Sequence, residues 1–153
     1  MQFISFLIYP QEKQLFGFGP FDFNSSKDVV RELMKEKFDK IPGYEKEDVM
    51  GFEGLDFLHE KMHLCVFFFE NDKLDEVDLV VENINQPTIA IFYNVIHYMT
   101  EEYGDPELYQ PDEWTAEWFY YDLPGKKIVA AIKLSPYTSD NVTTIKISFL
   151  KAE

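Results

Sequence analysis

The two histidines at positions 59 and 63 have the spacing that most directly matches a known chemistry. The string His59-Glu60-Lys61-Met62-His63 has the form H-E-x-x-H. On a helix, two such histidines share a face and bind Zn²⁺, and the glutamate polarises the bound water. The flanking residues, however, alternate like strands. We therefore expect a hairpin turn with two exposed imidazoles here, and a zinc-dependent hydrolase using His59, Glu60 and His63 is the alternative.

The segment 101–122 combines carboxylates with large aromatic side chains. It has no Lys or Arg and contains the acids Glu101, Glu102, Asp105, Glu107, Asp112, Glu113, Glu117 and Asp122. Its aromatic residues include Tyr103, Tyr109, Trp114, Trp118, Phe119, Tyr120 and Tyr121. Acids beside exposed aromatic rings suit recognition of a basic protein surface. The alternative is that the rings are core and the acids ordinary surface.

From this segment we predict a partner-binding set, with the acids steering association. The set is Glu101, Glu102, Asp105, Glu107, Glu113, Trp114, Glu117 and Trp118. The two tryptophans are expected on the same face of one strand, and they can anchor a contact only if that face is not the core.

Composition narrows the classes of partner. The chain has 153 residues and a formal net charge of −14, so nucleic acid and anionic membranes would be repelled and a basic protein attracted. The lone Cys65 sits in an apolar run without a basic neighbour in sequence, which predicts a buried thiol and a reducing, cytoplasmic location. The N-terminus lacks the features of a signal peptide. No cofactor and no catalytic constellation are expected, so we predict a protein that is not an enzyme.

The elements that must position these residues are two helices between groups of strands. Residues 3–9 and 14–18 predict a hairpin, and Ser25 is the expected N-cap of a helix that ends near Ile41. A second helix is expected from Thr88, ended by Gly104 and Pro106. The expected strands are 49–58, 62–69, 74–81, 114–121, 128–134 and 142–150, with loops at 43–48 and 135–141 and a turn at 123–126.

This order predicts an α+β fold. We expect an antiparallel sheet of six to eight strands with two helices, formed by a pseudo-duplicated α-βββ unit after an N-terminal hairpin. Residues 1–153 would form one domain, with half-repeats at 24–82 and 87–150. The run 64–69, LCVFFF, is apolar on both strand faces, so it should be covered on both sides or form an interface.

The second helix ends in Glu-Tyr-Gly-x-Pro, Glu102 to Pro106, and is followed by a Trp-bearing strand and two more strands. In this C-terminal half the chain resembles small acidic α+β bacterial immunity proteins of polymorphic toxin systems. The resemblance implies a non-enzymatic, cytoplasmic inhibitor that binds a basic toxin. The layout is also similar to small secretion chaperones, and a scaffold dimer joined through LCVFFF is a further alternative. The oligomeric state stays open.

Overall fold

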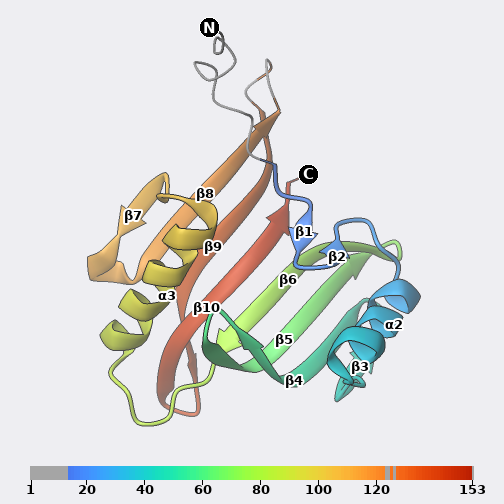
Figure 1. Cartoon of the computed structure of the whole chain (residues 1–153), viewed down its shortest axis with the longest axis horizontal. Coiled ribbons are helices and arrows are strands. Elements are labelled where there is room, and N and C mark those ends of the chain that lie inside the picture. The colour runs from blue at the N-terminus through green and yellow to red at the C-terminus, as the bar shows by residue number, and fades with distance from the viewer. Residues whose placement is uncertain (1–13, 123–124, 126, 153) are drawn as a thin grey trace, which may run out of the picture.

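The fold is α+β and is built on one eight-stranded antiparallel sheet with the strand order β3-β4-β5-β6-β10-β9-β8-β7 (Figure 1). The computed structural model describes residues 14–122, 125 and 127–152. The strands of the sheet are β3 (Tyr44–Lys46), β4 (Val49–Phe57), β5 (Glu60–Glu70), β6 (Lys73–Val81), β7 (Leu108–Gln110), β8 (Thr115–Asp122), β9 (Lys127–Ser139) and β10 (Val142–Lys151). The predicted fold class is confirmed.

The two halves of the chain meet edge to edge at the centre of this sheet. Helix α2 (Lys27–Phe38) precedes β3 to β6, and helix α3 (Thr88–Tyr103) precedes β7 to β10. The strand order is therefore symmetric about the β6–β10 pair. Each half has four strands rather than three, since each contains a short edge strand that is not among the expected strands. Both edge strands have only three residues, all exposed, so neither carries the apolar alternation that identifies a strand.

Helix α2 begins one residue later than predicted. Its N-cap is Ser26, not Ser25, and the Ser26 hydroxyl accepts a hydrogen bond from the Val29 amide at 3.2 Å. The helix ends at Phe38, before the predicted Ile41, because Asp39 adopts a left-handed conformation and its amide bonds back to Lys35 at 3.1 Å. Such a residue is a common helix stop.

Helix α3 has the predicted bounds, and one of its faces is buried. Phe92, Val95 and Met99 are fully buried, and Gly104 follows the last helical residue with its amide bonded to Thr100. Among the described residues, no helix is long and apolar enough to cross a membrane.

Both helices pack on one face of the sheet. Phe67 of β5 contacts Phe21, which stacks on Phe38 of α2, and Phe149 of β10 contacts Tyr103 of α3. Phe21 belongs to a small hairpin on this same side, formed by β1 (Gly17–Phe18) and β2 (Phe21–Asp22) (Figure 1). Only residues 17–18 of the predicted return strand 14–18 are strand, and the predicted strand 3–9 lies outside the described residues.

The other side of the sheet is covered by neither helix, and we call it the open face. Strand alternation and register place the following residues on it: Val49, Gly51, Leu64, Val66, Phe68, Glu76, Asp78, Val80, Lys146, Ser148 and Leu150. Of the apolar run LCVFFF, Cys65, Phe67 and Phe69 are buried in the core, whereas Leu64, Val66 and Phe68 on the open face are half-buried. Within the described chain, β5 is thus covered on one side only.

Tight turns join the long strands. Asp140 and Asn141 both have positive φ, which is the conformation of a two-residue hairpin turn of type I′. The predicted loop at 135–141 is therefore wrong, since β9 continues to Ser139 before this turn. Residues 123, 124 and 126 of the predicted turn at 123–126 lie outside the described residues.

Candidate functional site

The H-E-x-x-H string does not lie on a helix. Leu58 and His59 form the two-residue turn between β4 and β5, both with positive φ, and Glu60 and His63 belong to β5. The predicted hairpin turn is confirmed. The His59 ring is exposed and lies 4.7 Å from the ring of Tyr98. In the part of the chain that the structure describes, no group of three or more His, Cys, Asp or Glu residues could hold a metal ion. The zinc alternative loses the geometry on which it rested.

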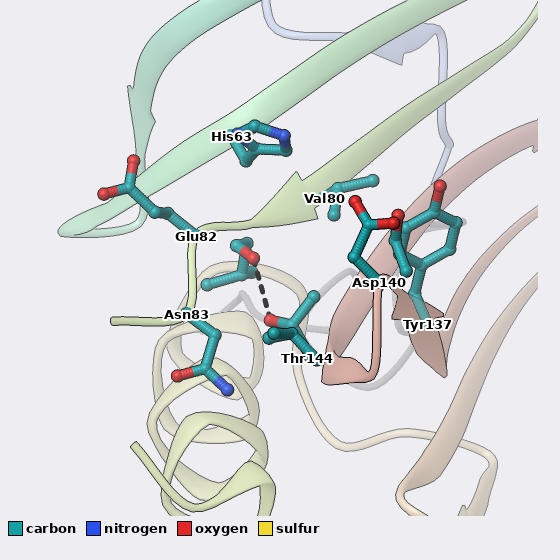
Figure 2. Close-up of a pocket in the computed structure, with 10 residues that line it drawn as sticks. His63, Val80, Glu82, Asn83, Tyr137, Asp140 and Thr144 are labelled. Carbon is teal, nitrogen blue, oxygen red and sulfur yellow. Dashed lines mark hydrogen bonds between the residues drawn. The ribbon is translucent and has the colours of Figure 1, made fainter. Parts of the chain in front are cut away.

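His63 instead lines an open pocket of about 220 Å³ at one end of β6 and β10. Figure 2 shows Glu82 and Asp140 on opposite sides of this view with His63 between them. The Thr144 hydroxyl donates to the Val81 carbonyl at 2.7 Å and so stabilises the strand pair. Among the hydrogen bonds of the described residues, none joins His63 to Glu82 or Asp140. The pocket therefore holds no organised acid–base pair.

The predicted acids gather at the β7 edge of the sheet. Six of them are exposed: Glu101, Glu102, Asp105, Glu107, Asp112 and Glu113. They come from the end of α3, from the loop to β7 and from the 3₁₀ turn η1 (Pro111–Glu113). We call this set the acidic edge. The sequence contains no Lys or Arg between residues 74 and 125, and the side chain of His97 contacts the acidic edge. Its Nε2 lies 2.7 Å from a Glu101 carboxylate oxygen.

Exposed apolar side chains adjoin the acidic edge. Tyr93 on α3 is 47% exposed, and Leu108 and Tyr109 on β7 are 51% and 45% exposed. The Tyr109 ring stacks at 6.2 Å on Phe92, which is buried. Tyr109 also borders a shallow hollow of about 330 Å³ whose rim includes Asp105. Aromatic and acidic groups thus share one exposed surface.

The two tryptophans predicted as anchors are buried or partly buried, unlike the exposed acids. Trp118 is 3% exposed, and its indole N–H donates to the Gly104 carbonyl at 2.8 Å. Trp118 lies on the face of β8 that packs in the core, so it cannot anchor a partner contact. Trp114 is not in the strand at all. It follows η1 in a left-handed conformation and is partly buried against the core.

Glu117 and Glu107 contact neighbouring side chains. Glu117 lies on β8 beside β9, and its carboxylate is 3.3 Å from the Lys133 ammonium. Glu107 accepts a hydrogen bond from the Tyr121 hydroxyl, which raises the pKa of Tyr121. Glu107 remains exposed at the edge, whereas Glu117 is part of an ion pair on the open face.

Sequence reasoning missed an acidic pair at the centre of the open face. Glu76 and Asp78 alternate along β6 with the core residues Val77 and Leu79, a pattern typical of a solvated strand face, yet Asp78 is only 8% exposed. Its Oδ1 atom is buried and has no hydrogen-bond partner in the structure, and its Oδ2 atom lies 3.9 Å from the Lys146 ammonium. Burial, with the neighbouring Asp78, raises the pKa of Glu76 to about 8. These acids lie in the middle of the sheet because β6 pairs with β10, and this pairing cannot be predicted from the sequence.

No family model matches this chain, and no match was found among curated proteins or solved structures.

Proposed function

We propose that this protein is a non-enzymatic binding protein whose acidic edge binds a basic protein partner, in the manner of an immunity protein that inhibits a basic toxin. The observation that carries the proposal is the gathering of six exposed carboxylates beside exposed Tyr93, Leu108 and Tyr109. We place the protein in the cytoplasm, because its lone thiol, Cys65, is buried and free and this suits a reducing compartment.

The charge pattern supports recognition of a cation-rich surface. The acidic edge lies within a stretch of sequence that has no Lys or Arg, so no cation close in sequence offsets its charge. A field of one sign raises association rates for an oppositely charged partner and repels nucleic acid. Glu101 and Glu102 also lie in the last turn of α3, where negative charge opposes the helix dipole at a cost of about 0.3–1 kcal/mol each. Carboxylates at this unfavourable position are consistent with a binding role for their charge.

The exposed apolar side chains would supply the contacts that hold a complex together, which charge alone does not supply. Electrostatic steering mainly sets association rate, whereas buried aromatic anchors hold a complex together. Tyr93 and Tyr109 are suited to that role, because the Tyr109 ring is held in place by Phe92. They replace the tryptophans that the sequence pattern favoured.

Charge reversal at the acidic edge tests the proposal. The variant carries Glu101→Lys, Glu102→Lys, Asp105→Lys and Glu113→Lys. A matched control carries the same charge change on exposed acids far from the edge in sequence: Glu32→Lys, Glu36→Lys, Glu47→Lys and Asp48→Lys.

The assay is the association rate with a basic protein that copurifies with the wild type, measured at low and high salt. We expect the edge variant to associate at least about tenfold more slowly at low salt, with a smaller difference at high salt. Equal slowing by the control variant would show that net charge, and not this surface, attracts the partner.

A further inference from the structure

The open face is not composed like a sheet face that is left in water. Helices α2 and α3 both pack on the other side of the sheet (Figure 1). An antiparallel sheet that is covered on one side usually presents polar residues on the other. Strand β5 instead presents Leu64, Val66 and Phe68 there, all half-buried. This composition indicates a surface that packs against another protein layer.

One cross-strand row of the open face is apolar from β4 to β8, and we call it the apolar row. The strand register connects its members in this order: Val49, Phe68, Glu76, Leu150, Ala131 and Phe119. Ala131 is buried, and the remaining members are half-buried. A contiguous apolar surface rimmed by polar residues marks a site of contact with another molecule.

Glu76 is the one acid in the apolar row, and it does not interrupt the row near neutral pH. Burial and hydrogen bonding to Asp78 raise its pKa to about 8. Glu76 is therefore mostly protonated at pH 7 and can donate to the Asp78 carboxylate. The Oδ2 atom of Asp78 also lies 3.9 Å from the Lys146 ammonium. The polar centre of the face thus finds its partners within the chain and calls for no charged ligand.

The charges of the open face cancel, although the whole chain has a formal net charge of −14. Beyond the middle of the face, Asp56 is paired with Lys61, and Glu70 with Lys73. Across the apolar row and the next two rows on the Gly51 side, the register places equal numbers of lysines and ionised acids: Lys46, Lys133, Lys146, Glu53, Asp78 and Glu117. A second copy of this acidic chain can therefore approach the open face without local repulsion.

The open face is large enough for a stable dimer. The six strands between the two short edge strands have eight or more residues each. At the usual strand spacing and rise, they cover about 29 Å by about 26 Å, a projected area of about 750 Å². This area is close to the roughly 800 Å² that each partner buries in a stable interface.

We propose that two copies of this protein associate through their open faces, with the apolar row of one copy packed against that of the other. A two-fold axis makes such a contact self-complementary. The two sheets would then form the inner layers of the dimer, and the helices would form its outer layers. A basic partner suits this face less well, because the face has no net charge to attract it. The proposal does not depend on the function of the acidic edge, whose helix α3 faces outward in this dimer.

Sedimentation velocity of the full chain over a range of concentrations tests the proposal. We expect a reversible dimer at micromolar concentrations. Added salt should strengthen this dimer, because salt screens the repulsion between two chains that each carry a net charge of −14. A dimer that is joined through the acidic edge would weaken with salt instead, and that result would contradict the proposal.

Variants locate the contact on the open face. Val49→Lys combined with Phe119→Lys puts a cation at each end of the apolar row. This change should weaken the dimer at least about a hundredfold, because each new charge occurs twice in the contact. The matched control, Val29→Lys combined with Ile89→Lys, makes the same kind of change at exposed residues of α2 and α3 and should leave the dimer unchanged. Urea unfolding of each variant checks that the chain still folds, and Phe119→Lys alone replaces the double variant if that one does not.

Three results would overturn the proposal. A wild-type chain that stays monomeric up to its solubility limit would do so without reliance on any variant. A dimer that persists in the folded apolar-row variant would place the contact outside the open face. A dimer that the control variant dissociates would assign the contact to the helices.

Discussion

Replacing Glu76 with glutamine should change how the stability of this protein depends on pH. The Glu76 carboxyl lies on the open face of β6 beside Asp78, and burial and Asp78 raise its pKa from the ordinary 4.5 to about 8. Between those two pH values the folded protein binds more protons than the unfolded chain. The free energy of unfolding therefore falls as pH rises through that window.

The size of the effect follows from the same pKa. At 1.36 kcal/mol per pKa unit, the full difference would correspond to roughly 5 kcal/mol. Because Glu76 is only half-buried, screening by water reduces the effect, and we expect about 1–2 kcal/mol. In Glu76→Gln the glutamine amide keeps the shape and can donate to Asp78, so the decline between about pH 5 and pH 8.5 should disappear.

Urea unfolding at several pH values across this window measures the effect directly. The matched control, Glu53→Gln on β4, leaves Glu76 and Asp78 in place and should keep the wild-type decline. If Glu76→Gln declines as steeply as the wild type does, Glu76 and Asp78 are not the source of the pH dependence.

Two further predictions concern the core. Trp118→Phe removes the 2.8 Å hydrogen bond from the indole to the Gly104 carbonyl. The substitution should lower the free energy of unfolding, measured in urea, by about 1–3 kcal/mol. A loss below about 0.5 kcal/mol would show that this bond does not hold β8 to the end of α3. Burial raises the pKa of the Cys65 thiol, so a thiol reagent such as dithionitrobenzoate should react with Cys65 only as the protein unfolds, and rapid labelling of the native protein would contradict its place in the core.

The elements with strong periodic patterns were predictable from the sequence. Helix α3 and strand β5 have the bounds that their apolar spacing indicated, to within two residues. The edge strands β3 and β7 were not predictable, because all their residues are exposed and their strand state comes from pairing with a neighbour. An apolar alternation in the sequence indicates a strand only where one face of that strand is buried, and these two strands have no buried face.

The candidate sites were predictable only in part. The acids near α3 could be expected at the surface from their charge alone. Which aromatic rings accompany them could not, because the alternation that puts Trp118 on one strand face does not say whether that face is core. The burial of Asp78 depends on β10 lying beside β6, a contact between residues about seventy positions apart, Asp78 and Ser148. Sequence spacing within one strand carries no information on such a neighbour.

The most direct test of the proposed binding function is hydrogen–deuterium exchange of this protein free and in complex with its basic partner. The account predicts that complex formation protects amides in the last turn of α3, in β7 and in η1, while α2 and β3 exchange as in the free protein. Protection confined to α2 and β3, with the acidic edge unchanged, would contradict it.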